Sequence, residues 1–252
     1  EERLLGVSLT GILDNKLMFN KSHVQIEAHL REMKETAIRT NLEFSKTLKI
    51  QQSTAITCVK PSGTVSQLVD SASGIHARYA PYYIRRVRGD LKDPLTRFLM
   101  DAGVPYEADV TNDEIMVFDF PQKAPEGALV TDKMTAIDQL KLWKIYQDNW
   151  CEHKPSITVS VAEDEWMEVG SWVWDNFDQV SGISFLPKSD HTYRQAPYEA
   201  ISKDQYEDLV KRSPKQIDWE ALASFEVEDN TASSQTFACS ADSCEVVDIG
   251  KS

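Results

Sequence analysis

Short runs rich in β-branched residues alternate with segments of helical period along most of this chain, and this alternation constrains its fold more than any other feature. The runs with the composition of buried strands are residues 53–59, 115–120 and 156–161. The segments with apolar residues at helical spacing are residues 23–48, 135–150 and 165–180. Such an alternation predicts an α/β fold with a substantial share of parallel strands.

A short turn, Pro61-Ser62-Gly63-Thr64, lies between one of these strand runs and a predicted helix start at Val65. Backbone N–H groups at a helix N-terminus lack intrahelical acceptors, so they favour an anion. Gly63 lets the backbone approach a ligand closely, and the hydroxyls of Ser62 and Thr64 add donors. An ordinary helix N-cap without a ligand would have the same residues, so the turn alone leaves both interpretations open.

The charge and cysteine content exclude several classes of protein. A net charge of −13 makes the chain a poor general binder of nucleic acid or anionic membrane, so any phosphate site must be local. The densest basic cluster is Arg85, Arg86 and Arg88. No apolar run is long enough to span a membrane, and no signal peptide pattern is present. Four cysteines are too few for a disulfide scaffold, which favours a reducing, cytoplasmic location.

Two of these cysteines, Cys239 and Cys244, lie in a polar segment without periodicity, residues 227–252, which we expect to be a flexible tail. Two thiols this close on a mobile segment suit thiol–disulfide exchange. No further Cys or His lies nearby to complete a four-ligand metal site, which disfavours a metal, and we name no metal-ligating residue. From the spacing alone, a redox pair, a metal ligand pair and two incidental surface cysteines all remain open.

The other two cysteines and one histidine have less specific surroundings. We expect Cys58, within a strand run, to be a buried small hydrophobe, and Cys151 to be structural although His153 is close in sequence. His76 either contacts a ligand near the turn or makes a local hydrogen bond. The sequence does not decide between these two roles.

The segment KPSGTVSQLVDSASGIHARYAPYYIRRVR, residues 60–88, resembles the corresponding segment of adenosylcobalamin-dependent (class II) ribonucleotide reductases. The string GVSLTGILDN at residues 6–15 and the tail cysteine pair are similar to the same family. The strings GISFLPK and QAPYE, at residues 182–188 and 195–199, are most similar to its monomeric, triphosphate-reducing branch. The resemblance covers nearly the whole chain, but only the last third or so of the family's usual length.

This resemblance implies a fold and a reaction. Residues 1–226 would form the C-terminal part of a ten-stranded α/β barrel, followed by a redox-active tail over residues 227–252. The reaction would be the radical reduction of ribonucleotides, expected to be triphosphates, to 2′-deoxyribonucleotides, with adenosylcobalamin as the cofactor. The substrate phosphates would bind at Pro61, Ser62, Gly63, Thr64 and Val65.

The resemblance also implies a role for the tail. Cys239 and Cys244 would re-reduce the disulfide that each turnover leaves in the active site, and thioredoxin would then reduce the tail pair. The radical chemistry needs a thiyl cysteine, which the family carries in an Asn-Pro-Cys string, and no such string occurs in this chain. We therefore expect an N-terminal portion of the same enzyme to supply it, and the chain alone to be incomplete.

Two origins fit this expectation, a fragment of a longer chain and one piece of a split enzyme. A barrel that lacks strands exposes hydrophobic edges, which favours association with the missing portion. The alternative is a non-catalytic remnant that binds nucleotides or another protein. The cysteine pair favours the enzyme, because a binding module gains nothing from a mobile dithiol.

Overall fold

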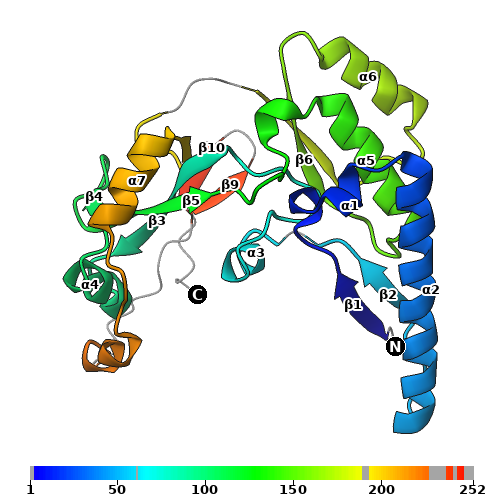
Figure 1. Ribbon diagram of the computed structural model, residues 1–252, viewed down its shortest axis with the longest axis horizontal. Helices are drawn as coiled ribbons and strands as arrows, with labels where there is room; N and C mark the ends of the chain where they lie inside the picture. Colours follow the sequence, from blue (N-terminus) through cyan, green and yellow to red (C-terminus); the bar gives the residue numbers. More distant parts are fainter. Residues whose placement is uncertain (1–2, 61, 189–192, 227–236, 241–242, 247–252) are drawn as a thin grey trace. The chain divides into compact units, whose positions relative to one another are not determined.

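The computed structural model describes residues 3–60, 62–188 and 193–226, and the backbone of residues 237–240 and 243–246 (Figure 1). The chain divides into two compact units, each built from two segments. Unit 1 comprises Glu1–Tyr82 and Lys123–Thr192, and unit 2 comprises Tyr83–Gln122 and Tyr193–Ser252. In the described part of the chain, no helix is both long and apolar enough to cross a membrane.

The strands of unit 1 form two parallel pairs, as the alternation of strands and helices predicted. Strand β1 (Leu4–Ser8) pairs with β2 (Ala55–Cys58), and β6 (Ile157–Val161) pairs with β7 (Ile183–Pro187). The register places Ser8 beside Cys58 at the ends of the first pair. The segments that follow β1 and β2 therefore leave from the same edge of the sheet.

Seven helices of unit 1 connect and cover these strands in the described residues. They are η1 (Ile12–Asp14), α1 (Lys16–Phe19), α2 (His23–Leu48), α3 (Val65–Leu68), η2 (Thr131–Lys133), α5 (Ala136–Asn149) and α6 (Trp166–Asp175). Helix α2 begins with a capping box between Ser22 and Gln25, and its span of residues 23–48 confirms the prediction.

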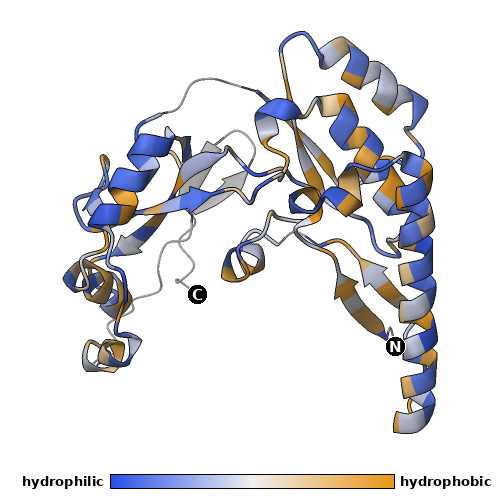
Figure 2. Cartoon of the chain, in the orientation of Figure 1, coloured by the Kyte–Doolittle hydropathy of each residue, from blue (hydrophilic) through white to orange (hydrophobic). Residues whose placement is uncertain are grey.

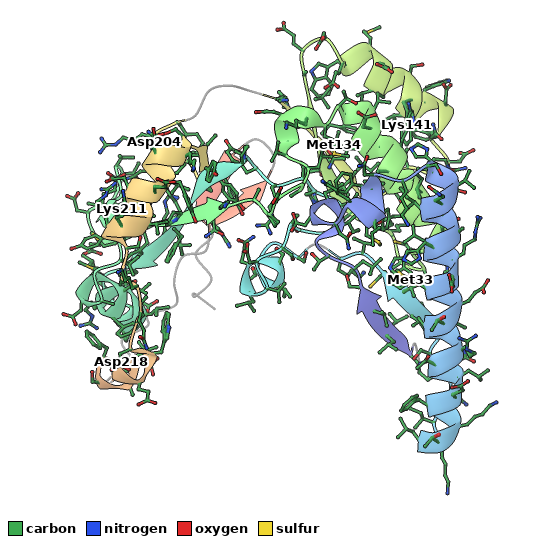
Figure 3. The ribbon with its side chains drawn as sticks, in the orientation of Figure 1. Met33, Met134, Lys141, Asp204, Lys211 and Asp218 are labelled. Atoms are coloured by element: carbon green, nitrogen blue, oxygen red, sulfur yellow. The ribbon has the colours of Figure 1, made fainter. Side chains whose placement is uncertain are left out.

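The core of unit 1 lies where α2 and α5 pack against the strands. Trp143 and Tyr146 of α5 are fully buried. Both polar groups have partners, because Trp143 Nε1 donates to the Pro155 carbonyl and the Tyr146 hydroxyl donates to the Met18 carbonyl. Met33 and Met134 pack against this core from its edge (Figure 3). Figure 2 shows that β1 and β2 are also largely hydrophobic.

Unit 2 is built on a four-stranded sheet with the order β4-β5-β3-β8. Its strands are β3 (Tyr82–Asp90), β4 (Tyr106–Ala108), β5 (Ile115–Lys123) and β8 (Tyr198–Ala200), and the β4–β5 and β3–β8 pairs are antiparallel. Its helices are α4 (Pro94–Asp101), α7 (Lys203–Arg212) and η3 (Trp219–Ser224). Helix α4 starts with Asp93 as N-cap and is followed by Gly103 in a left-handed conformation.

The tail contains one hairpin. Strands β9 (Phe237–Ser240) and β10 (Ser243–Val246) pair antiparallel, so these two segments have a regular structure that the sequence did not predict. The rest of residues 227–252 lies outside the described residues. The tail boundary at residue 227 stays a prediction, and so does the closed barrel, because the sheets of the described residues have two or four strands.

Candidate phosphate site

The turn predicted to bind phosphate follows β2 directly, where the Lys60 amide donates to the Ser8 hydroxyl at 3.0 Å. Helix α3 comes next, and the Ser66 amide donates to the Ser62 carbonyl at 2.7 Å. Pro61 itself lies outside the described residues. With four residues α3 is a single turn, so its dipole is small, and any anion binding here depends on individual amides instead.

The outer side of the turn offers two such amides. Gly63, Thr64 and Val65 are exposed, and no acceptor in the described part of the chain receives the N–H of Gly63 or Thr64. A Cβ added at Gly63 would meet nothing within 4 Å, so the space above this residue is open. Among the described residues the turn therefore presents two adjacent backbone donors without an acceptor, and the space above Gly63 is open. Adjacent backbone donors of this kind can bind a phosphate oxygen.

The inner side of the turn is engaged with the rest of unit 1. Ser62 Oγ lies 2.7 Å from Thr10 Oγ1 and 3.3 Å from Ser73 Oγ, and it accepts the Gly74 amide at 3.2 Å. The Ser62 amide donates to Ser73 Oγ at 3.3 Å. We expected the Ser62 hydroxyl to be a free donor, whereas the structure directs it to partners within the protein.

The loop that carries Ser73 is fixed by a buried arginine. The Arg78 guanidinium makes a bidentate ion pair with Asp14 and a further pair with Asp70 at 2.9 Å. Asp14 Oδ2 also accepts the Ala72 amide at 2.7 Å. Asp14, at the end of η1, thus ties both ends of the loop to the segment that follows β1.

His76 makes the local hydrogen bond that was one of the two roles left open by the sequence, and it makes a second bond to a distant strand. Its Nε2 accepts the Thr158 amide at 3.1 Å, so Nδ1 carries the proton and donates it to the Ser73 carbonyl at 2.8 Å. Burial lowers the pKa of His76, although the bond to Ser73 opposes this shift. Both ring nitrogens are therefore occupied by the backbone.

The two cysteines of unit 1 are free thiols, and their structural role stays a prediction. Cys58 is fully buried at the end of β2. Burial raises the pKa of the Cys151 thiol to about 12, so it carries almost no thiolate at neutral pH and is a poor nucleophile. For the tail pair, the hairpin places Cys244 directly opposite Cys239 in the backbone register, while both side chains lie outside the described residues.

The arginine cluster of the sequence lies on β3 in unit 2, and two of its members are neutralised there. Arg86 pairs with Asp119 at 3.0 Å and with Glu199 at 2.6 Å. Arg88 pairs with Asp109 at 2.8 Å. Burial raises the pKa of Asp119 despite the neighbouring Arg86 charge. These contacts give the cluster a structural role within unit 2.

Sequence reasoning missed Thr10, Ser73 and Gly74 as members of the site. Thr10 and Ser73 both stood in strings similar to the reductase family, but nothing in a linear sequence connects them to Ser62. Parallel pairing of β1 with β2 could have predicted the contact between Thr10 and Ser62, because it brings the ends of these two strands together.

Comparisons with known proteins extend over nearly the whole chain. No protein family model matches the chain. The adenosylcobalamin-dependent ribonucleoside-triphosphate reductase of Euglena gracilis is 31% identical over 247 residues, which are 96% of this chain and 33% of that protein. The reductase of the same name from Lactobacillus leichmannii is 30% identical over 235 residues, which are 82% of this chain and 32% of that protein.

A solved structure shows the same fold. The crystal structure of a B12-dependent (class II) ribonucleotide reductase matches with a TM-score of 0.77 and 24% identity, covering 89% of this chain and 35% of that one. The chain belongs to the family of the adenosylcobalamin-dependent ribonucleoside-triphosphate reductases. It spans about a third of the length of the curated reductases that it matches.

The names of these reductases imply adenosylcobalamin, so we examined whether unit 1 fits this group. One cavity lined by described residues of unit 1 has a volume of about 700 Å³, and residues 123–128 contribute most of its lining. That volume suits a ligand of drug size, whereas adenosylcobalamin is far larger. The cavity does not fit the cofactor, and we assign none of the described residues to it.

Proposed function

We propose that this chain forms part of an adenosylcobalamin-dependent ribonucleoside-triphosphate reductase and binds the phosphates of the ribonucleotide substrate. The observation that carries this proposal is the outer side of the turn after β2. There the amides of Gly63 and Thr64 have no acceptor in the described residues, and the space above Gly63 is open. The relatives at about 30% identity support ribonucleotide as the ligand class.

The contacts of the turn favour phosphate as the bound group. A phosphate has several acceptor oxygens and no need for a donor, which matches a site made of backbone N–H groups. Ser62 contributes to the shape of the turn, and the Thr64 side chain is exposed beside the two amides. Pro61 and Val65 complete the predicted site at its two ends.

The tail dithiol is the second part of the proposal. Cys239 and Cys244 pass electrons to the active site and are themselves reduced by thioredoxin. Their direct opposition across the β9–β10 hairpin supports this role, because residues opposite each other in an antiparallel ladder are close enough for a disulfide. The thiyl cysteine is expected in the two thirds of the relatives' length that this chain does not span.

A reconstitution tests the proposal. Ribonucleoside triphosphate reduction is measured with adenosylcobalamin and dithiothreitol, first for this chain alone and then for its mixture with a polypeptide that supplies the remaining two thirds of a reductase. We expect deoxyribonucleotide only from the mixture. A chain that binds nucleotide but gives no product in the mixture is instead a binding module.

A further inference from the structure

Three hydroxyl groups meet beneath the phosphate turn, and they come from three separate segments of unit 1. Thr10 follows β1, Ser62 follows β2, and Ser73 lies in the loop after α3. The Thr10 and Ser62 hydroxyl oxygens are 2.7 Å apart, the usual length of an O–H···O hydrogen bond. The parallel pairing of β1 with β2 makes this contact possible.

The neighbours of these hydroxyls fix the direction of each hydrogen bond. Thr10 Oγ1 lies 3.0 Å from the Ala72 carbonyl oxygen, which only accepts, so the single hydroxyl proton of Thr10 goes to Ala72. The Ser62 hydroxyl must then donate to Thr10. With the Ser62 proton committed, the contact of 3.3 Å between Ser62 and Ser73 requires the Ser73 hydroxyl to donate to Ser62.

Backbone amides complete this chain of hydrogen bonds. The Gly74 N–H points at both Thr10 Oγ1, at 3.1 Å, and Ser62 Oγ, at 3.2 Å. Gly74 has a φ of +49°, and a Cβ there would lie 3.3 Å from Val59 Cγ1, so glycine is the residue that suits this position. In return, the Ser62 amide donates to Ser73 Oγ. The hydroxyl proton of Ser62 is therefore already used inside the protein.

This arrangement separates two tasks within the turn. Ser62 is held by both its amide and its hydroxyl, whereas the next two amides, of Gly63 and Thr64, keep no acceptor in the described residues. We propose that Thr10 and Ser73 are positioning residues of the phosphate site. Through Ser62 they fix the backbone that presents these two amides to the phosphate. The proposal rests on the proposed function, because it concerns the same site.

Substitutions at Thr10 separate the hydroxyl from the shape of the side chain. Thr10→Val keeps the shape and removes the hydroxyl, and Thr10→Ser keeps the hydroxyl. Ser73→Ala removes the other end of the chain and leaves the Ser62 amide without its acceptor. If the loosened turn costs phosphate binding as much as one hydrogen bond, we expect phosphate affinity to fall by about three- to tenfold in Thr10→Val and Ser73→Ala. We expect Thr10→Ser to bind phosphate like the original chain.

Glycine amides provide the readout. The sequence contains three Ser-Gly steps, which end at Gly63, Gly74 and Gly182. Cell-free synthesis with ¹³C-carbonyl serine and ¹⁵N-glycine therefore gives an HNCO spectrum with three peaks for the original chain and for Thr10→Val. Ser73→Ala loses the Gly74 peak, and Thr10→Ser gains a peak from Gly11. Gly63 reports the phosphate in every variant, and Gly74 reports the hydroxyl chain in the variants that keep Ser73. Gly182, directly before β7, reports whether the variant is folded. The probe is inorganic tripolyphosphate, titrated into each variant of the full chain.

The outcomes distinguish the two proposals. We expect tripolyphosphate to shift the Gly63 peak of the original chain and to leave Gly182 in place. If Gly63 does not respond at all, the phosphate assignment fails and the positioning role fails with it. If Gly63 responds equally in the original chain, Thr10→Val and Ser73→Ala, the site stands and the positioning role is overturned. Equal weakening in Thr10→Ser and Thr10→Val also overturns it, because the hydroxyl would then be irrelevant.

Discussion

The hydroxyl of Thr10 lies 2.7 Å from the hydroxyl of Ser62, although 52 residues separate them in sequence. This contact links the segment after β1 to the turn after β2. It also explains why the turn keeps its shape although α3 is only one turn long and cannot hold it alone. Among the described residues, the amides of Gly63 and Thr64 have no acceptor, so they are the donors that we expect a ligand to use.

Replacing Gly63 with valine tests these amides. A side chain there enters the space through which a phosphate approaches, so we expect ribonucleoside triphosphate affinity to fall by about tenfold or more. Because a Cβ at Gly63 meets nothing within 4 Å, we expect the free energy of unfolding to change by less than about 0.5 kcal/mol. Calorimetric titration and urea unfolding measure the two quantities.

A matched control exists in α6, where a Cβ at Gly170 also meets nothing within 4 Å. Gly170→Val should leave nucleotide affinity unchanged. Unaltered affinity in Gly63→Val would contradict the phosphate assignment.

Removing either tail cysteine should separate single from multiple turnover in the reconstituted enzyme. With Cys239→Ser or Cys244→Ser, we expect one turnover per active site and no further product with thioredoxin, because the active-site disulfide can no longer be exchanged. Quenched-flow product analysis measures the amount of product from the first turnover and the steady-state rate of later turnovers separately. Cys151→Ala is the control, since the pKa of about 12 keeps this thiol out of exchange chemistry. Full thioredoxin-driven turnover in the serine variants would disprove the shuttle role.

His76 should make unit 1 sensitive to acid. Its pKa in the folded chain is lowered below the ordinary value of 6.5, so the unfolded chain binds more protons as the pH falls. The stability contributed by neutral His76 is therefore complete above pH 6.5 and is lost as the pH drops through the folded pKa. Between about pH 7.5 and about pH 5, urea unfolding should show a smaller decrease in the free energy of unfolding for His76→Gln than for the original chain. Identical pH profiles would refute the assignment of this loss to His76.

The two carboxylates paired with Arg78 should differ in importance. Asp14 is 14% exposed, makes the bidentate pair and accepts the Ala72 amide, whereas Asp70 is 71% exposed. We expect Asp14→Ala to reduce the free energy of unfolding by about 3–5 kcal/mol, because it strips a buried guanidinium of its main partner. Asp70→Ala should cost about 1 kcal/mol or less, as for an exposed ion pair. Comparable losses in urea unfolding would show that Arg78 does not depend on Asp14.

Elements with strong local signals were predictable from the sequence. Helix α2 covers the predicted residues, because Ser22 and Gln25 form a capping box that marks its start. Helix α4 has similarly clear local signals, because Pro94 suits its first position and Gly103 follows its end. Helix α6 ends at Asp175, before the predicted residue 180, where the Asn176 side chain donates to the Trp172 carbonyl. Strands β4 and β8, with three residues each, are too short for any periodicity to reveal them.

The candidate site was predictable only in part, for a physical reason. The outward face of the turn depends on residues adjacent in sequence, such as Gly63 and Thr64, so its composition indicated its chemistry. The inward face depends on contacts that only strand pairing creates. For this reason the commitment of the Ser62 hydroxyl to Thr10 could not be read from the sequence.

The reconstituted reduction of CTP by the original chain and by Gly63→Val, with adenosylcobalamin and dithiothreitol, tests the central claim most directly. Dithiothreitol bypasses the tail, so only the phosphate site differs between the two reactions. We predict that KM for CTP rises by about tenfold or more in the variant. The variant should unfold at the same urea concentration as the original chain. An unchanged KM in an active, folded variant would contradict the claim that this turn holds the substrate phosphates.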